Sequence, residues 1–367
     1  MTSKRLILNG YYGFDNFGDE LILISLIRLF RRYGYELTVL SASPAVTRQR
    51  YGVGAVHRYN PFQVFVSLLR SHAFISGGGG LLQDSTGPNS AIYYAGMMLL
   101  ARLFGLKVLH AFTSVGPLVE ASSRTLTSWG LKACDFIIVR DEKSATEVEN
   151  LTGVRPLVAA DAVWLLPPLG GSKLPNPMLG EGGTLWKVGL SLRPHSRFSV
   201  ADEQALVHHL SDVLERAAQG LQVEVSLISC EDAMDLPVLE GVEEQLRLSL
   251  SASAREKITF KLISQSSAWA TLAKMHWVIG MRYHALVSAL LNKVPAYALD
   301  YDPKVEMLAK DLRLPSTPVD ALIRATSHDF LQGLEAYQAP DLTPLIQSVE
   351  SAFSALRIVL ESEHQRH

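Results

Sequence analysis

The feature that most constrains the fold is a regular alternation of strand-like and helix-like segments along most of the chain. In the first half, apolar runs such as RLILNG, ELTVLSA and KVLHAF alternate with helix-like stretches over 19–33, 61–71 and 90–104. Alternation at this spacing predicts βαβ units around a parallel sheet. The segment 167–183 is rich in Pro and Gly, and its apolar residues follow neither the helical nor the strand period. The alternation restarts after it with LWKVGLSLR. The sequence therefore predicts an α/β protein with two sheets.

The length agrees with two domains. The chain has 367 residues, 48% of them apolar, and a domain of about 150 residues is typical. We expect one lobe over 1–168 and a second over 184–340. The tail 342–367 has the pattern of a long amphipathic helix. We expect this helix to pack back on the first lobe.

Charge and cysteine content exclude several classes of protein. With 34 Lys and Arg against 36 Asp and Glu, the formal net charge is −2, which argues against a nucleic-acid partner. Cys134 and Cys230 form neither a disulfide framework nor a CxxC metal motif, so a reducing compartment, the cytoplasm, is expected. The longest apolar stretch, 91–104, contains Arg102 and is shorter than the roughly 20 residues that span a bilayer. No transmembrane helix is predicted.

The first 75 residues carry nine Lys or Arg and only four acidic residues. With the helix-spaced residues Phe62, Phe65 and Leu69, this basic segment could rest peripherally on an anionic membrane surface. The alternative is an ordinary amphipathic helix packed on a sheet, and we favour it from the sequence alone.

A glycine-rich turn, GYYGFDNFGDE, follows the first predicted strand. Its glycines, Gly13 among them, permit positive φ and would let backbone N–H groups approach an anion at a helix N-terminus. Tyr12 and Phe14 suit stacking on a sugar or base. The turn matches neither GxGxxG nor a Walker P-loop, and a purely structural turn is the alternative.

A second glycine run, SGGGGLLQD, follows the strand-like AFI. Ordering consecutive glycines such as Gly78 and Gly79 is entropically costly, which suggests that something approaches the backbone closely. Gln83 and Asp84 then stand at a predicted helix start. Asp84 could cap that helix or bond a sugar hydroxyl.

Four cations stand at predicted strand ends. Arg282 and Lys304 lie where a helix begins, and a cation in the first turn costs about 0.3–1 kcal/mol. Arg193 ends the strand KVGLSL, and Arg140 ends DFIIV in the first half. All four are candidate anion ligands. For each one taken singly, a surface salt bridge is the alternative.

His284 lies in the same turn as Arg282, in the string GMRYHAL. Because imidazole titrates near neutrality, His284 could give or take a proton, although a lone histidine is usually structural. The sequence has no HExxH, no CxxC and no Asp/His cluster at metal spacing. Neither a metal nor another cofactor is predicted.

Seven strings in order along the chain resemble the polysaccharide pyruvyl transferases, most closely the CsaB type. The strings are GYYGFDNFGDE, SGGGGLLQD, VRDEKS, ADAVW, SLRPH, GMRYHAL and DYDPKV. The resemblance implies two Rossmann-like lobes of GT-B-like form with a cleft between them. It also implies transfer of a pyruvyl group from phosphoenolpyruvate to a sugar as a ketal. The implied acceptor is an N-acetylmannosamine-type sugar of a lipid-linked cell-wall precursor. The alternative is an acceptor sugar that is linked to a nucleotide instead of a lipid.

The resemblance also implies roles for the candidate residues. Arg193, Arg282 and His284 resemble the phosphoenolpyruvate site, and Lys304 and Arg140 resemble further donor contacts. The acceptor side would be made by the two glycine turns, with Tyr12, Gly13, Phe14, Gly78, Gly79, Gln83 and Asp84. Since phosphoenolpyruvate carries a carboxylate and a phosphate, arginine and lysine are the partners its chemistry requires.

Two other functions fit the same features. One is a nucleotide-sugar-dependent glycosyltransferase of GT-B architecture, which would also set glycine turns and cations against a diphosphate. The other is a non-catalytic protein that binds a glycan or a polyprenyl phosphate. Consumption of phosphoenolpyruvate without release of a nucleotide distinguishes the pyruvyl transferase from the glycosyltransferase. Replacing His284 by Ala distinguishes it from the binding protein, which has no turnover to lose.

Overall fold

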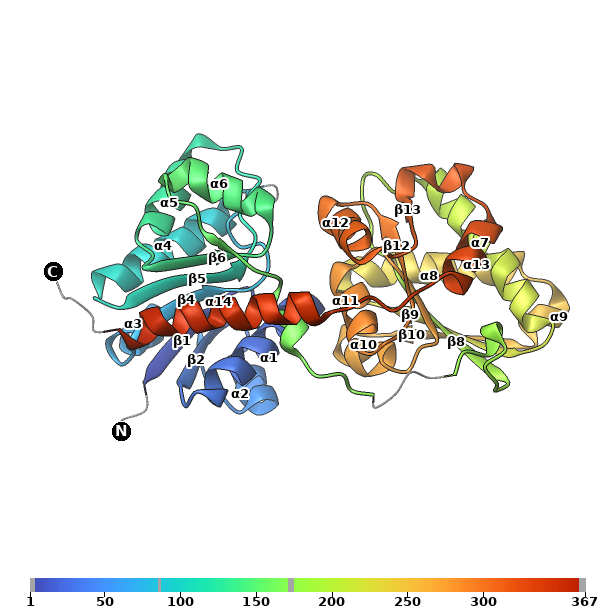
Figure 1. Ribbon diagram of the computed structural model, residues 1–367, viewed down its shortest axis with the longest axis horizontal. Coiled ribbons are helices and arrows are strands. Elements are labelled where there is room, and N and C mark those ends of the chain that lie inside the picture. Colours follow the sequence, from blue (N-terminus) through green and yellow to red (C-terminus); the bar gives the residue numbers. More distant parts are fainter. Residues whose placement is uncertain (1–3, 85–86, 171–174, 363–367) are drawn as a thin grey trace. The chain divides into compact units, whose positions relative to one another are not determined.

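A computed structural model describes residues 4–84, 87–170 and 175–362 (Figure 1). The chain forms two compact units: unit 1 comprises residues 1–166 and 342–367, and unit 2 comprises residues 167–341. Each unit is built around its own parallel sheet. The prediction of an α/β protein with two Rossmann-like lobes is confirmed.

Unit 1 contains a seven-stranded sheet of order β3-β2-β1-β4-β5-β6-β7. Its strands are β1 (Arg5–Asn9), β2 (Glu36–Ser41), β3 (Gly54–His57), β4 (Ala73–Gly77), β5 (Lys107–Thr113), β6 (Phe136–Val139) and β7 (Leu157–Val158). Its helices are α1 (Phe17–Arg32), α2 (Pro44–Tyr51), α3 (Pro61–Leu69), α4 (Asn89–Leu103), α5 (Ala121–Lys132), α6 (Glu142–Thr152), the short η1 (Ala162–Leu165) and α14 (Thr343–Glu361).

The central strands of unit 1 are buried on both faces. All seven residues of β5 and all five of β4 are buried, as expected for a parallel sheet that helices cover on both sides. On one side α4 packs against α5, and α5 packs against α6. Apolar side chains of α4, such as Tyr94 and Met98, complete the core there.

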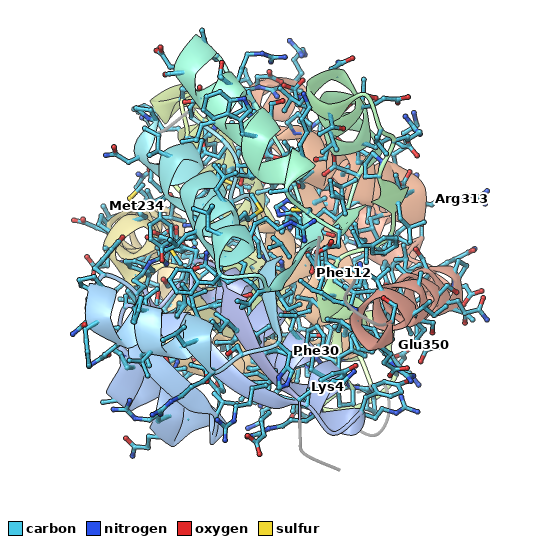
Figure 2. All side chains as sticks on the ribbon, turned by 90° about the vertical axis from the view of Figure 1, so that its left-hand side faces the viewer. Lys4, Phe30, Phe112, Met234, Arg313 and Glu350 are labelled. Carbon is cyan, nitrogen blue, oxygen red and sulfur yellow. The ribbon has the colours of Figure 1, made fainter. Side chains whose placement is uncertain are left out.

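The carboxy-terminal helix α14 belongs to unit 1. The ring of Phe353 meets Phe30 of α1 edge-on, with centroids 5.2 Å apart, and the Arg357 guanidinium lies 3.9 Å from the ring centroid of Tyr33. Figure 2 shows Phe30 beside α14. The Lys107 ammonium also donates to the carbonyl oxygen of Val359, at 2.6 Å.

Unit 2 contains a six-stranded sheet of order β10-β9-β8-β11-β12-β13. Its strands are β8 (Leu185–Ser191), β9 (Gln222–Ile228), β10 (Ile258–Ile263), β11 (Trp277–Gly280), β12 (Ala296–Asp300) and β13 (Ser316–Pro318). Its helices are η2 (Pro177–Leu179), α7 (Val200–Ala218), α8 (Asp232–Ser249), α9 (Ala252–Arg255), α10 (Gln265–Leu272), α11 (Tyr283–Leu291), α12 (Pro303–Leu312), η3 (Val319–Arg324) and α13 (Ser327–Glu335).

Both sheets reverse their strand order at one point. The reversal lies between β1 and β4 in unit 1 and between β8 and β11 in unit 2. In open parallel sheets, ligands bind outside the carboxyl ends of the strands at such a switch point. The two glycine turns follow β1 and β4, while Arg193 and Arg282 come two residues after β8 and β11. The fold therefore places the two glycine turns at one switch point, and Arg193 and Arg282 at the other.

Several elements of the structure have no counterpart in the sequence-based prediction. Helix α2 and strand β3 lie between the predicted strand 36–42 and the predicted helix 61–71, and α5 lies between β5 and β6. Helix α2 buries only Thr47, so it lacks the apolar stripe that reveals a helix in a sequence. None of the described helices is long and apolar enough to cross a bilayer.

Candidate functional site

Arg193 is half-buried at the switch point of unit 2, whereas Arg282 is buried. Its guanidinium lies 3.4 Å from both the Tyr301 hydroxyl and the Pro194 carbonyl oxygen, which are neutral acceptors. No carboxylate among the described residues forms an ion pair with Arg193. Burial raises the pKa of Tyr301 despite the opposing effect of Arg193, so its phenol stays protonated. The positive charge of Arg193 is therefore not neutralised within unit 2.

Arg282 caps α11 and is held in a buried ion pair. Its Nε donates to both carboxylate oxygens of Asp235, at 3.1 and 3.0 Å, and its Nη2 contacts Asp235 and, at 3.4 Å, Glu231. Burial opposes the charge of Arg282, but the hydrogen bonds and charge of Asp235 outweigh it and raise the pKa. The ion-pair alternative thus applies to Arg282, although the pair is buried rather than on the surface.

His284 and Lys304 lie in the first turns of α11 and α12. The ring of His284 is half-buried and meets Tyr283 at a right angle, with centroids 5.0 Å apart. Lys304 is exposed, and Asp302 caps its helix by accepting the Lys304 N–H at 2.7 Å, as predicted. Because β11 and β12 are neighbours in the sheet, both residues stand at the same edge as Arg193.

Two other residues at this edge have displaced pKa values. Burial, together with the charge of Arg193, lowers the pKa of His195, whose ring packs edge-on against Tyr301. Burial raises the pKa of Cys230 to about 12. His195 is thus mainly neutral at neutral pH, and Cys230 is a thiol rather than a nucleophilic thiolate.

Arg140 ends β6 in unit 1, so it lies on a different sheet from the other three cations. Its Nε donates to the Ser114 hydroxyl at 2.6 Å, and its Nη1 contacts Asp161 at 2.8 Å. Both charged side chains of this pair are buried. The ion-pair alternative therefore applies to Arg140 as well, again in a buried form.

The first glycine turn differs from the expected anion cradle. Asn16 caps α1 by accepting the N–H groups of Gly18 and Asp19, and the Gly13 N–H donates to Glu20 at 2.8 Å. These amides already have protein partners. The prediction that Gly13 offers its N–H to an anion is therefore wrong, because an acidic side chain of the protein takes that position.

Of the aromatic residues of this turn, Tyr12 is buried, whereas Tyr11 and Phe14 are accessible. Tyr12 is completely buried and its hydroxyl bonds to the Gly77 carbonyl, so its predicted stacking on a sugar is wrong. Phe14 stacks on Tyr11 at a centroid distance of 4.2 Å and an interplanar angle of 8°. Tyr11 is 37% exposed. Stacking on a ligand stays a prediction for Phe14, with Tyr11 added.

The second glycine turn packs closely against α1. A Cβ at Gly78 would meet Ile22, and a Cβ at Gly79 would clash with the Asp19 carboxylate; both glycines have positive φ. The close approach predicted for these glycines is thus made by α1. Gln83 follows in an irregular segment, half-buried.

Asp84 does not cap the helix that follows it. Its carboxylate accepts the N–H groups of Val119, at 2.9 Å, and Glu120, at 2.8 Å, immediately before α5. These backbone hydrogen bonds lower the pKa of Asp84. The prediction that Asp84 caps the next helix is therefore wrong. Helix α4 begins only at Asn89, and the Asp84 carboxylate instead contacts the start of α5.

Sequence reasoning did not single out Arg58, which follows β3. Arg58 is 4% exposed, donates to the Gly10 carbonyl oxygen at 2.8 Å, and lies within 5.5 Å of four ring centroids. The rings belong to Phe14, Tyr59, Tyr93 and Tyr94. No carboxylate of the described residues pairs with it. The only signal in the sequence is the adjacent string HRYN, which is too short to reveal such a cluster.

The predicted residues thus fall into two groups. Unit 2 brings Arg193, Arg282, His284 and Lys304 to the ends of three adjacent strands, β8, β11 and β12. Unit 1 holds Arg140, the glycine turns, Phe14 and Asp84. Within the described parts of the chain, no group of three or more His, Cys, Asp or Glu is arranged to hold a metal ion.

Two α/β units, each with a parallel sheet of Rossmann-like order, define a two-lobed fold of GT-B-like form. A family model described as polysaccharide pyruvyl transferase matches residues 16–303, which is most of the chain. The chain therefore belongs to the polysaccharide pyruvyl transferase family, and membership in this family implies a transferase enzyme.

Solved structures of similar fold include a glycosyltransferase from Rickettsia africae, with a TM-score of 0.62, 10% identity, and coverage of 98% of this chain and 100% of the other. Alr3699/HepE from Anabaena in complex with UDP and glucose has a TM-score of 0.56 and 13% identity, covering 95% and 99%. The UDP-GlcNAc 2-epimerase of Methanocaldococcus jannaschii has a TM-score of 0.59 and 10% identity, covering 97% and 99%. At these identities the likeness concerns the fold alone.

Proposed function

We propose that this protein transfers the pyruvyl group of phosphoenolpyruvate to two hydroxyls of a sugar, forming a cyclic ketal. The observation that carries the proposal is the pair Arg193 and Arg282, which flanks the switch point of unit 2 in a member of this family. The acceptor we propose is an N-acetylmannosamine-type sugar of a lipid-linked cell-wall precursor, as the sequence resemblance implies.

The donor site is built from the cations of unit 2. Phosphoenolpyruvate carries a carboxylate and a phosphate, and guanidinium groups bind both in bidentate fashion. Arg193 has only neutral partners in unit 2, so it supplies the main unneutralised charge. Asp235 fixes the Arg282 guanidinium, and its carboxylate compensates the positive charge of that group. Arg282 therefore serves chiefly to orient the donor. Lys304, exposed on the neighbouring strand end, adds a point charge.

Ketal formation requires two C–O bonds to form at C2 of the donor and one to break. A proton adds to the methylene carbon, which becomes the methyl group, and the first sugar hydroxyl attacks C2. Phosphate then leaves with its bridging oxygen, and the second hydroxyl closes the ring. The two sugar hydroxyls release two protons. One replaces the proton that was added to the methylene carbon, and the other leaves on the phosphate. His284 is the residue we assign to this proton transfer, either as acid toward the methylene or as base toward a hydroxyl.

Cations around the leaving phosphate stabilise the charge that develops as the C–O bond breaks. Because arginine and lysine side chains supply this charge, we expect no requirement for a divalent metal. A chelator should leave turnover unchanged, whereas a loss that magnesium restores would contradict this part of the proposal.

The acceptor site is proposed for unit 1. The accessible Tyr11–Phe14 stack offers an aromatic face to a sugar ring, and Gln83 offers an amide for its hydroxyls. The family resemblance assigns Arg140 a donor contact, and its guanidinium is held by two separate partners, Ser114 and Asp161. Replacing Arg140 by Lys keeps the charge but loses the paired geometry, so we expect lower turnover.

The test incubates the purified protein with phosphoenolpyruvate and a panel of lipid-linked and nucleotide-linked amino sugars. We expect phosphate release coupled to a pyruvylated product identified by mass spectrometry, without release of a nucleotide. His284→Ala should lose turnover and keep donor binding, while His208→Ala, an exposed histidine on α7, serves as the matched control. Nucleotide release without phosphoenolpyruvate consumption would instead indicate a glycosyltransferase, and binding without any turnover a glycan-binding protein.

A further inference from the structure

Helix α3 leaves three large apolar side chains in solvent. Phe62, Phe65 and Leu69 are 74%, 47% and 62% exposed, and their i, i+3, i+7 spacing puts them on one face. The helix packs on unit 1 through Val64, Ser67 and Leu68 instead. The amphipathic helix packed on the sheet, which the sequence favoured, therefore occurs, but Phe62, Phe65 and Leu69 do not form its packing stripe, which lies on the opposite side of the helix.

The exposed face continues onto the end of α4. The ring of Phe65 meets Phe104 edge-on, with centroids 5.4 Å apart, and the adjacent Leu103 is 84% exposed. We call Phe62, Phe65 and Leu69 the α3 face. Clustered exposed apolar side chains of this kind mark a surface that binds something.

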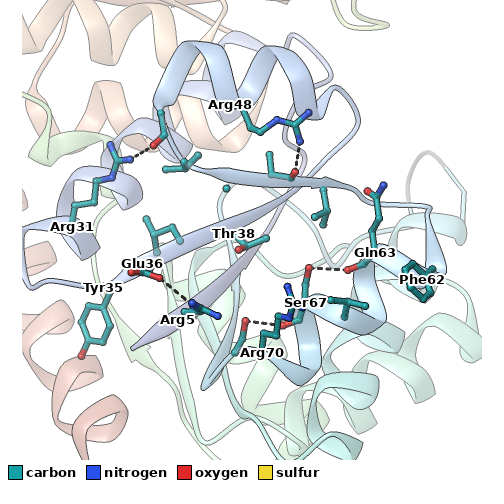
Figure 3. A pocket seen from close by; sticks show the side chains of 18 residues that line it. Arg5, Arg31, Tyr35, Glu36, Thr38, Arg48, Phe62, Gln63, Ser67 and Arg70 are labelled. Carbon is teal, nitrogen blue, oxygen red and sulfur yellow. Dashed lines mark hydrogen bonds and ion pairs between the residues drawn. The ribbon is translucent and has the colours of Figure 1, made fainter. Parts of the chain in front are cut away.

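A pocket lined by arginines adjoins the α3 face. It has a volume of about 730 Å³, and Phe62 of α3 and Arg70, which follows α3, contribute to its wall (Figure 3). Arg5, Arg31 and Arg48 also line it, against a single acidic residue, Glu36. Arg31 and Arg48 donate to backbone carbonyl oxygens, so no carboxylate neutralises them there. The pocket is therefore positively charged.

The surrounding sequence is almost free of acidic residues. Between residues 37 and 119 the chain has one acidic residue, Asp84, and six Lys or Arg, of which Arg58 and Lys107 are buried and Arg102 pairs with Asp135. Asp84 is buried, and its carboxylate is occupied by backbone amides. The segment that carries the α3 face thus presents positive charge with no exposed acidic side chain of its own.

We propose that the α3 face and the adjoining arginine pocket bind the surface of a lipid bilayer that contains anionic lipids. The apolar side chains enter the boundary between headgroups and acyl chains, as the apolar side of an interfacial helix does. The arginines hold lipid phosphates, for which guanidinium is well suited. A bilayer supplies an apolar layer and closely spaced anionic groups together, which matches the two adjacent halves of this surface. The proposal does not rest on the pyruvyl transfer reaction, because it concerns binding in the absence of both substrates.

The test is co-sedimentation of the full chain with vesicles of phosphatidylcholine, alone or mixed with an equal part of phosphatidylglycerol. We expect binding to the mixed vesicles and much weaker binding to phosphatidylcholine. Phe65→Ser and Leu69→Ser should each weaken binding to the mixed vesicles about tenfold, as expected for one large apolar side chain that no longer leaves water. Raising the ionic strength to about 1 M, where charges are screened within about 3 Å, should also weaken it.

Two matched variants make the result specific. Ile358→Ser removes a side chain that is 72% exposed on α14 of the same unit, and it should bind as the unmodified chain does. Arg70→Glu should weaken binding to mixed vesicles and leave phosphatidylcholine binding unchanged. Melting curves establish that each variant is folded. The four substituted residues, Phe65, Leu69, Arg70 and Ile358, are all exposed, so their replacement spares the core.

Equal binding to both kinds of vesicle, or equal effects of Phe65→Ser and Ile358→Ser, would overturn the proposal. A dimer that forms without vesicles and dissociates on Phe65→Ser would show that the α3 face binds a second copy of the chain instead. Sedimentation equilibrium of the same variants makes that distinction.

Discussion

Gly79 shows how a single residue constrains the second glycine turn. Its φ is +63°, in the left-handed region, and an added Cβ would overlap the Asp19 carboxylate at the start of α1. Its neighbour Gly80 has no atom within 4 Å of its added Cβ and no positive φ. The two adjacent glycines therefore have different reasons to be present, although the sequence treats them alike.

We predict that Gly79→Ala destabilises unit 1 by about 2 kcal/mol, because left-handed backbone alone costs an alanine about 1–2 kcal/mol and Asp19 must also move. Gly80→Ala is the matched control, for which we expect less than about 0.5 kcal/mol. Urea denaturation of both variants measures the difference. Equal stabilities would show that the turn relaxes without cost.

His110 gives a pH dependence at the scale of one residue. It is completely buried on β5, within 3.3 Å of the Ser76 hydroxyl, and burial lowers its pKa from 6.5 to about 3. Below pH 6.5 the unfolded chain therefore takes up a proton that the folded chain does not. Stability that is complete above pH 6.5 is lost as the pH falls toward 3.

We predict a loss of about 1.4 kcal/mol per pH unit from this residue in that range. His110→Gln cannot titrate, so the slope of unfolding free energy against pH should be smaller in this variant by that amount. Denaturation at a series of pH values below 6.5 measures both slopes. Parallel slopes would mean that His110 is protonated in the folded protein.

At the scale of elements, the Asp235–Arg282 pair joins α8 to the start of α11. Asp235 is completely buried and also accepts the N–H groups of Cys230 and Glu231, so it fixes the turn after β9 as well. Removing one partner of a buried pair leaves an uncompensated charge in the protein interior. The pair thus sets both the stability of unit 2 and the position of Arg282.

We predict that Asp235→Asn destabilises unit 2 by about 3 kcal/mol. The matched control is Asp320→Asn, whose partner Arg197 lies 2.7 Å away in a half-exposed pair, and we expect it to cost less than about 1 kcal/mol. Thermal or chemical denaturation compares the two. A similar cost for both would contradict the role assigned to the buried pair.

Elements with a strong apolar period could be predicted from the sequence, and elements without one could not. The strands RLILN and AFISG, the long helices, and the Asp302 cap of α12 all occur where the pattern placed them. Helix α2 has one buried residue and no such period. For α3 the period was seen, but periodicity alone does not say whether an apolar stripe faces a sheet or the solvent.

The candidate site could be predicted in part, for a similar reason. Strand ends are visible in a sequence, so the cations that follow β8, β11 and β12 were found. Their partners were not, because Asp235 is 47 residues from Arg282 and Tyr301 is 108 residues from Arg193. The burial of Tyr12 could not be foreseen either, since it depends on β4, which is distant in the chain.

At the scale of the whole molecule, the two sheets share the order of their first six strands, to which unit 1 adds β7, and the two units have different residues at the switch point. Unit 1 places glycine turns there, and unit 2 places arginines. The chain crosses from one unit to the other twice, since α14 returns to unit 1 after unit 2 is complete. This division assigns the anionic donor to unit 2 in our account.

The most direct test of that assignment is calorimetric titration of phosphoenolpyruvate into the full chain and two variants. Arg193→Ala should weaken binding about tenfold to a hundredfold, as expected for lost hydrogen bonds to a charged group. Arg197→Ala removes a neighbouring arginine that is paired with Asp320, and its effect should stay within about threefold. Equal affinities for the two variants, or no binding to the unmodified chain, would contradict the account.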